Sequence, residues 1–220
     1  MAERQLQPLT MLLEKNNIKV IFATQSESRK KALREKGLGF VEYINPDCDE
    51  YTEETDPKKY VIEVAQKKVH AVSEKLKKQT GAVNTIIIGA DTVVTIDTYD
   101  NVKQILTKPK DKCDAISMLK RLSGKKNVVV TGFVILMPDG KEIPDHVETS
   151  VEFGNLTDEQ VHYYVESGEP MICAGGYAIQ GLAGTFIKGI EGDYFSVLGA
   201  PVYKICEKLY QYLADPESVY

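Results

Sequence analysis

Cysteine is scarce in this chain of 220 residues, and its few cysteines stand far apart. There are four: Cys48, Cys113, Cys173 and Cys206. Because they form no C-x-x-C pair, the sequence argues against a zinc or disulfide framework and favours reduced thiols, the usual state in the cytoplasm. The three histidines show no zinc-ligand spacing either.

Long apolar runs are also missing. The longest charge-free stretch, residues 170–187, contains four glycines and Gln180, whereas a membrane-spanning helix needs about 20 predominantly apolar residues. Residues 1–20 hold no apolar core of the length that a secretory signal needs. We therefore expect a cytoplasmic protein that does not act at a membrane.

The chain has little net charge: 27 lysines and arginines against 32 acidic residues give −5. A protein that binds nucleic-acid polymers non-specifically needs a basic face, so no such partner is expected. A nucleotide requires only a local cationic pocket. The hydrophobic fraction of 43% is typical of a globular protein, which excludes a disordered chain.

The common nucleotide and hydrolase motifs are absent. The chain has neither a G-x-G-x-x-G motif nor a G-x-S-x-G nucleophile elbow. Residues 184–189 have the glycine spacing of a P-loop, but Ile190 and Glu191 follow where that motif needs lysine and a hydroxyl residue. Any chemistry must therefore come from other segments.

Short apolar runs alternate with helical patterns along the chain, which predicts an α/β fold with a mixed sheet flanked by helices. We expect strands at residues 18–23, 40–44, 85–89, 93–96, 128–137 and 147–153, and helices at 26–36, 57–80, 111–124, 157–168 and 201–213. The domain organisation expected is an N-terminal extension over 1–17, one domain over 18–214 and a C-terminal tail over 215–220.

The first candidate site is the segment 23–31, which follows a strand and opens a helix. The hydroxyls of Thr24, Ser26 and Ser28 and the free N–H groups there form a natural phosphate cradle. Arg29 and the next two lysines have the wrong sign for the N-terminus of a helix, and a polyphosphate would offset that penalty. The alternative is a serine-capped helix with solvated cations.

Asp91 and Thr92 form the second candidate, because a carboxylate there ends an otherwise apolar strand. Ligands gather at strand ends in α/β folds. Asp91 is therefore expected to bind a divalent metal or to orient a water. The alternative role for Asp91 is to cap the turn that follows.

Further candidates are acidic and basic. Glu50 lies in an acidic segment, residues 47–54, which is either a metal or base site or a solvated loop. Lys68 on the long helix and Lys108 before Pro109 are either phosphate ligands or surface lysines.

Residues 174–181 are rich in glycine, which lets a backbone approach a ligand closely. Gln180 in this segment offers one acceptor and two donors, which suits the edge of a base. The alternative is a glycine-rich turn between two strands.

Together these segments resemble the Maf family of nucleoside triphosphate pyrophosphatases, and the match runs over residues 21–209. The family motif A-S-x-S-P-R-R appears at 23–29 with substitutions, and G-A-D-T-V-V is intact at 89–94. The other matching motifs are L-x-K-P at 106–109, M-L-x-x-L-S-G at 118–124, S-G-E-P at 167–170, A-G-G-Y-A-I-Q-G at 174–181 and G-D-Y-x-x-V-x-G-x-P at 192–201.

This resemblance implies a fold related to the inosine-triphosphate pyrophosphatases, with two lobes around a cleft. It implies hydrolysis of a nucleoside triphosphate between the α and β phosphates, with Mg²⁺ or Mn²⁺ as cofactor, and a homodimer.

The resemblance also assigns roles to residues. Asp91 matches the proton acceptor, and Glu50 and Asp91 would hold the metal. The other site positions match Ser26, Arg29, Lys68, Lys108 and Gln180, and Thr24 replaces the first serine while keeping a hydroxyl. The lysines and Arg29 would hold the polyphosphate, whereas Thr92 and Gln180 would contact the nucleoside.

Two positions depart from the family pattern. Ser28 stands where the first arginine is usual, and we expect Lys30 or Lys31 to substitute in part or selectivity to broaden. Cys173 resembles the branch that favours N7-methylguanosine triphosphate, whereas residues 177–181 resemble the branch acting on dTTP and UTP. The longer motif favours dTTP and UTP. A non-catalytic nucleotide-binding regulator and a phosphatase releasing orthophosphate remain the alternatives.

Overall fold

The computed structural model describes residues 8–35, 38, 41–80, 84–98 and 103–214. Within them, seven strands form one sheet in the order β2-β1-β3-β5-β6-β7, and β4 also pairs with β3. The strands are β1 (Lys19–Ala23), β2 (Glu42–Ile44), β3 (Thr85–Asp97), β4 (Lys103–Leu106), β5 (Lys126–Leu136), β6 (Glu142–Phe153) and β7 (Ile187–Glu191). The α-helices are α1 (Pro8–Lys15), α2 (Glu27–Glu35), α3 (Pro57–Thr80), α4 (Lys112–Leu122), α5 (Asp158–Glu166), α6 (Tyr194–Val197) and α7 (Val202–Ala214). The 3₁₀ turns are η1 (Glu169–Ile172), η2 (Ala174–Gly176) and η3 (Leu182–Phe186).

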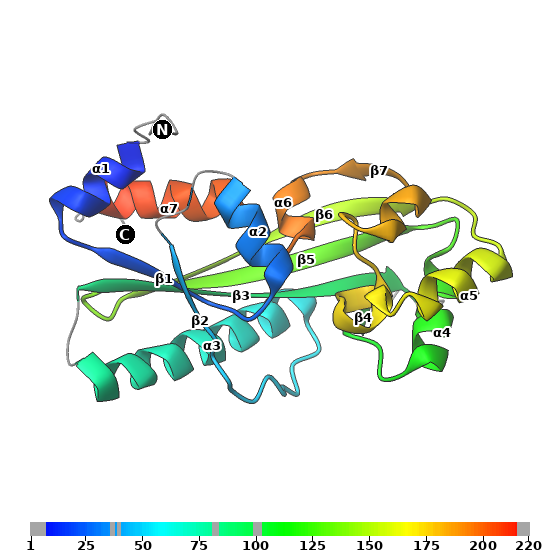
Figure 1. Cartoon of the computed structure of the whole chain (residues 1–220), viewed down its shortest axis with the longest axis horizontal. Helices are drawn as coiled ribbons and strands as arrows, with labels where there is room; N and C mark the ends of the chain where they lie inside the picture. The colour runs from blue at the N-terminus through cyan, green and yellow to red at the C-terminus, as the bar shows by residue number, and fades with distance from the viewer. Residues whose placement is uncertain (1–7, 36–37, 39–40, 81–83, 99–102, 215–220) are drawn as a thin grey trace.

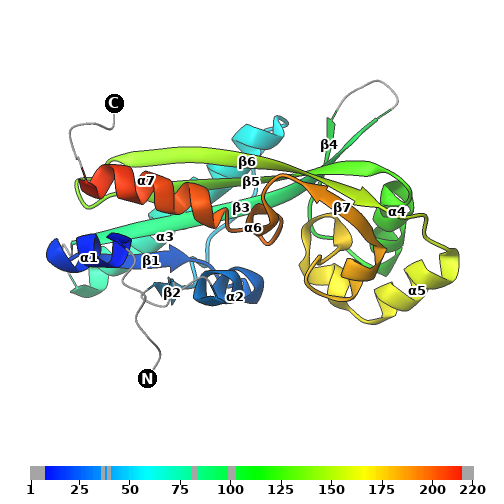
Figure 2. The same ribbon diagram turned by 90° about the horizontal axis from the view of Figure 1, so that it is seen from above.

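The sheet is mixed, which confirms the predicted fold class. Strand β1 runs parallel to β2 and β3, whereas β3, β5, β6 and β7 pair antiparallel. The long strands β3, β5 and β6 extend through the whole molecule, with α3 on one face and α1 and α7 on the other (Figure 1). Helices α4 and α5 and the 3₁₀ turns gather at the far end of these strands, as Figure 2 also shows.

Helix α3 packs closely on the sheet. Its apolar residues Val61, Ala65, Val69 and Val72 follow one another at spacings of three or four and are buried, and each buried valine contributes about 1.5–3 kcal/mol. The close approach depends on Gly89 of β3, because a Cβ there would lie 2.5 Å from the carbonyl oxygen of Ala65 and 2.7 Å from a methyl carbon of Val69. This contact fixes the distance between α3 and the middle of β3.

We expect Gly89→Ala to lower the free energy of unfolding by about 1–3 kcal/mol, because the added methyl group must push the α3 backbone away. Gly189→Ala in β7 is the matched control, since a Cβ there meets nothing within 4 Å. Urea denaturation of both variants measures the difference. Equal stability of the two would show that α3 can shift freely.

Two apolar cores share the face of the sheet opposite α3. The first core joins α1, α2 and α7 to β1 and to the halves of β3, β5 and β6 that lie beside them. The second core joins α4, α5 and the 3₁₀ turns to the other halves of these strands. Between them, the register partners Thr92 of β3 and Thr131 of β5 interrupt the apolar pattern. The two cores therefore make two lobes, as the fold prediction expected.

Asp91 does not end a strand, so that expectation is wrong. Strand β3 is continuous because β5 pairs with it without interruption from Ile87 to Thr95. On the other edge of β3, however, β1 ends opposite Gly89 and β4 ends opposite Val94. Among the described strands, none pairs with the edge of β3 between these two positions, and Asp91 lies in this gap.

Three further segments differ from expectation. The glycine-rich segment is not a turn between two strands, because Gly175 and Gly176 both have positive φ and the chain forms successive 3₁₀ turns. Strand β6 begins at Glu142, earlier than predicted. The stretch 1–17 contains α1, whose Leu9 and Leu13 are buried in the first core.

Two predicted boundaries, at residues 36 and 40, and the predicted C-terminal tail at 215–220 lie outside the described residues. Within the part of the chain that the structure describes, no helix combines the length and apolar character needed to cross a membrane.

Candidate active site

A cleft of about 570 Å³ lies between the two lobes, at the gap beside β3. Its walls come from the end of β1, the start of α2, α3, β3 and the 3₁₀ turns. All ten residues predicted from the sequence line it: Thr24, Ser26, Ser28, Arg29, Glu50, Lys68, Asp91, Thr92, Lys108 and Gln180. The structure thus brings together candidates that are spread over most of the chain.

Lys68 is buried, with only 3% of its surface exposed, so the alternative of a surface lysine is wrong. Its Nζ lies 2.8 Å from Oδ1 of Asp91 and 3.0 Å from Oε2 of Glu50, and it also donates to the Ala90 carbonyl at 3.4 Å. An ammonium has three protons, so these three acceptors use all of them. In this arrangement Lys68 holds two carboxylates in place and has no N–H left to donate to a ligand.

The two carboxylates differ in exposure. The Asp91 side chain is 13% exposed and the Glu50 side chain 45% exposed. The second oxygen of Asp91 has no hydrogen-bond partner among the described residues. Within the acidic segment 47–54, which is fully described, Glu50 is the residue that lines the cleft. The remainder of the segment fits the interpretation of a solvated loop.

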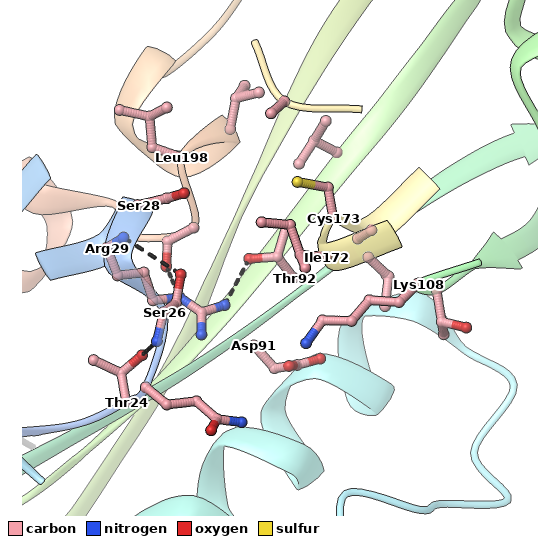
Figure 3. Close-up of a pocket in the computed structure, with 18 of the residues that line it drawn as sticks. Thr24, Ser26, Ser28, Arg29, Asp91, Thr92, Lys108, Ile172, Cys173 and Leu198 are labelled. Atoms are coloured by element: carbon pink, nitrogen blue, oxygen red, sulfur yellow. Dashed lines mark hydrogen bonds between the residues drawn. The ribbon is translucent and has the colours of Figure 1, made fainter. Parts of the chain in front are cut away.

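Arg29 contacts Thr92 whereas Lys68 contacts Asp91, and because successive side chains of a strand point to opposite faces, the two cations lie on opposite faces of β3. Arg29 is held at two points, of which Figure 3 shows the contact with Thr92. Its Nε donates to the carbonyl of Gly199 at 2.6 Å, and its Nη2 donates to Oγ1 of Thr92 at 3.2 Å. Gly199 has a φ of +87°, and a Cβ there would lie 2.9 Å from the Arg29 Nε. The remaining guanidinium nitrogen of Arg29 has no hydrogen-bond partner in the part of the chain that the structure describes, and the two contacts fix its direction.

The Thr92 hydroxyl is part of a chain of hydrogen bonds and is not free. It hydrogen-bonds to Thr131 at 2.9 Å, and Thr131 donates to the Ser196 carbonyl at 2.7 Å. Burial lowers the pKa of Arg29, whereas the negative charges of Asp91 and Glu50 oppose that change. The cation and the carboxylates therefore attract one another across the cleft.

At the start of α2, hydroxyl groups cap the helix. The Ser26 N–H donates to Oγ1 of Thr24 at 3.0 Å, and the Arg29 N–H donates to Oγ of Ser26 at 3.5 Å. Lys30 pairs with Glu27 at 2.7 Å. Neither Lys30 nor Lys31 lines the cleft, so the structure does not support the hypothesis that one of them replaces the missing arginine.

The other end of the cleft is less charged. Here Nε2 of Gln180 donates to Oγ of Ser28 at 2.9 Å, which joins α2 to the segment between η2 and η3. Ile172 also lines this end and is 72% exposed. Burial raises the pKa of the Cys173 thiol to about 11, so the thiol is neutral at pH 7 and is not an activated nucleophile.

Lys108 and Glu169 have contrasting roles. Lys108 is exposed, and Figure 3 shows its side chain extending toward Asp91. Glu169 of the S-G-E-P motif instead organises the 3₁₀ turns, because its carboxylate accepts hydrogen bonds from the Tyr164 hydroxyl at 2.8 Å and the Leu182 N–H at 3.1 Å. This motif therefore shapes the cleft wall without lining it.

The sequence analysis assigned no role to Tyr60 and Gly199, which line the cleft, or to Thr131, which supports Thr92. Thr131 interrupts an apolar strand, which is a signal that could have identified it. Tyr60 carries no such signal, because a tyrosine in the first turn of an amphipathic helix is ordinary. Among the described residues, no group of three or more histidine, cysteine or acidic side chains is placed to hold a metal ion.

Known proteins resemble this chain over most of its length. The dTTP/UTP pyrophosphatase of Thermoanaerobacter sp. (strain X514) is 38% identical over 193 residues, which cover 87% of this chain and 95% of that protein. The dTTP/UTP pyrophosphatase of Alkaliphilus oremlandii (strain OhILAs) is 40% identical over 188 residues, covering 84% and 92%. A solved HAM1 protein from Coxiella burnetii aligns with a TM-score of 0.47 at 12% identity, covering 88% of this chain and 99% of that one.

The family model described as "Maf-like protein" matches residues 19–212, which include all ten predicted cleft residues. This match and the relatives above confirm the resemblance found in the sequence motifs, and the chain belongs to the Maf-like protein family.

Proposed function

We propose that this protein is a nucleoside triphosphate pyrophosphatase that releases pyrophosphate and the nucleoside monophosphate, with dTTP and UTP as preferred substrates. The observation that carries the proposal is the cleft itself, where buried Lys68 holds Asp91 and Glu50 while Arg29 and Lys108 bring positive charge to the same space. The relatives named dTTP/UTP pyrophosphatase support the same reaction.

The phosphate end of the cleft is preorganised. The Arg29 guanidinium is fixed by Gly199 and Thr92, so its free nitrogen needs no reorientation to bind a phosphate oxygen. Lys108 is exposed and flexible, and it closes on the polyphosphate as a second cation. These groups neutralise the charge that would otherwise repel an attacking water.

The donor set fits a divalent cation bound together with the substrate. Mg²⁺ is commonly held by one or two carboxylates, with phosphate oxygens and waters completing its shell. Glu50 and Asp91 are the carboxylates that would hold it. A bound Mg²⁺ or Mn²⁺ would supply charge neutralisation at the phosphates.

Asp91 takes the proton of the attacking water in this proposal. Its Oδ1 is held by Lys68, so the carboxylate has one orientation and its second oxygen faces the cleft as an acceptor. The water oxygen bonds to phosphorus, the anhydride bond between the α and β phosphates breaks, and pyrophosphate leaves. Asp91 accepts the proton that the water loses.

The base end favours thymine and uracil. Because Nε2 of Gln180 is engaged by Ser28, Oε1 of Gln180 remains to accept the N3–H that thymine and uracil share. Cytosine presents an acceptor at the same position and would leave the amide oxygen unpaired. Ser28 thus orients the amide of Gln180 and does not itself supply a charge.

Gln180→Ala is expected to reduce the preference for UTP over CTP by roughly 3–10-fold in kcat/KM, since one neutral hydrogen bond is lost. Steady-state kinetics on both nucleotides measure the ratio. Gln25→Ala is the control, because this amide lies between Thr24 and Ser26 and should affect both nucleotides equally. An unchanged ratio in Gln180→Ala would remove Gln180 from base selection.

Product analysis tests the function as a whole. The protein is incubated with Mg²⁺ and a panel of dTTP, UTP, CTP and N7-methylguanosine triphosphate, and the phosphate product is identified. Pyrophosphate from dTTP and UTP is the expected result. Orthophosphate would indicate a phosphatase, and tight binding without turnover would indicate a regulator. Preference for the methylated purine would make Cys173 the better guide to specificity.

A further inference from the structure

Tyr60 lines the cleft but has no role in the reaction described above. It lies in the first turns of α3, two helical turns before Lys68. Its ring packs against the cluster of Val61, Val93 and Val130. The apolar contacts therefore hold the ring in place beside the gap in β3, on the same side of the sheet as Lys68.

The Tyr60 hydroxyl has no hydrogen-bond partner among the described residues. Every fully buried polar side-chain atom in that part of the chain does have a partner, so the hydroxyl of this half-buried residue must open to solvent. The buried tyrosines behave differently, because Tyr164 donates to Glu169 at 2.8 Å and Tyr177 donates to Asn127 at 2.9 Å. Tyr60 thus presents an unused hydroxyl to the cleft.

The surroundings of Tyr60 suit a neutral donor. Burial raises its pKa, and the negative charges of Asp91 and Glu50 raise it further. A phenol ordinarily titrates near pH 10, so Tyr60 keeps its proton at neutral pH. Lys68 donates its three protons to the Ala90 carbonyl and the two carboxylates. Among the described α3 side chains that line the cleft, Tyr60 is therefore the one with a free donor.

We propose that the Tyr60 hydroxyl binds the triphosphate, donating a hydrogen bond to a phosphate oxygen from the α3 wall of the cleft while Arg29 binds from the opposite side. This inference rests on the proposed function and adds a substrate-binding residue to it. A neutral donor there holds a phosphate near two carboxylates without forming an ion pair with them.

Tyr60→Phe tests the inference with two measurements. Inorganic tripolyphosphate is titrated into the full-length protein in the presence of Mg²⁺ by calorimetry, and kcat and KM are measured on UTP. Removing a hydrogen bond to a charged group should weaken tripolyphosphate binding by roughly 10–100-fold and lower kcat/KM on UTP by a similar factor. The unfolding midpoint should not change, because the ring remains.

Two control variants locate the effect. Tyr163→Phe lies on α5 outside the cleft, where the ring is 80% exposed, and should bind tripolyphosphate like the native protein. Tyr203→Phe, on α7 and also outside the cleft with a ring that is 73% exposed, should do the same. A loss confined to Tyr60→Phe places the hydroxyl at the phosphates.

Binding within twofold of the native value in Tyr60→Phe would overturn the inference, as would a native protein that does not bind tripolyphosphate. The proposed function fails in a different way. If the native protein releases no pyrophosphate from any nucleotide, yet binds tripolyphosphate through Tyr60, then the reaction is wrong and the phosphate contact stands.

Discussion

Asp91→Asn is expected to lower kcat on UTP by about 10²–10⁴-fold at saturating Mg²⁺, which is the usual contribution of a general base. Asparagine has the same size and keeps an oxygen for Lys68, whose Nζ lies 2.8 Å from Oδ1 of the native side chain. The substitution therefore removes the charge and the proton acceptor while leaving the packing. Steady-state kinetics and thermal unfolding measure the two consequences separately.

Asp97→Asn is the matched control for this variant. Asp97 ends the same strand β3 but is exposed and does not line the cleft, so its loss should leave kcat unchanged. If Asp91→Asn retained turnover within a few-fold of the native enzyme across a range of Mg²⁺ concentrations, Asp91 would be a structural partner of Lys68 and the proposed mechanism would be wrong.

Local rules predicted the elements that depend on neighbouring residues. The Asp111 side chain caps α4 by accepting from the Asp114 N–H, and Thr157 and Gln160 form a capping box at the predicted start of α5. The apolar spacing of α3 likewise identified its buried face. Each of these signals lies within a few residues of the structure that it specifies, so sequence alone suffices.

The gap at Asp91 depends instead on strand pairing. From the sequence, a polar pair after an apolar run indicates the end of a strand. The structure continues β3 through Asp91 because β5 supplies hydrogen bonds along one edge, while β1 and β4 leave the other edge open. Only the register of three strands distant in sequence reveals that opening.

The burial of the Lys68 charge likewise depends on residues distant in sequence. Lys67 and Lys68 are adjacent, and the helical spacing of Val61, Ala65 and Val72 places Lys68 rather than Lys67 on the inner face of α3, but that spacing does not tell which charges Lys68 meets there. Lys68 is buried because its partners Glu50 and Asp91 come from a loop and a strand on either side of α3 in sequence. The family resemblance, not the pattern, named Lys68 as a candidate site residue, and the structure places it in the cleft wall.

Lys68→Ala is expected to lower the free energy of unfolding by about 1–3 kcal/mol, because it leaves the mostly buried Asp91 carboxylate without its partner. Fully buried pairs lose about 3–5 kcal/mol, but the Glu50 side chain is 45% exposed and water replaces part of its contact. Turnover should fall by about 10²-fold or more, since Asp91 loses its fixed orientation. Lys78→Ala, on an exposed position of the same helix, should change stability by less than about 0.5 kcal/mol.

The double variant Lys68→Ala with Asp91→Asn distinguishes two causes of instability, which are the lost packing of the Lys68 side chain and the unpaired charge of Asp91. If the unpaired carboxylate causes the instability, neutralising Asp91 should restore part of the lost free energy, so the two changes together are less damaging than their sum. Urea denaturation of the four proteins in the cycle measures this coupling. Two outcomes would mean that Lys68 does not hold the carboxylates in solution: additive losses of unfolding free energy in the cycle, or a Lys68→Ala variant as stable as Lys78→Ala. Either outcome would remove the arrangement on which the proposed reaction depends.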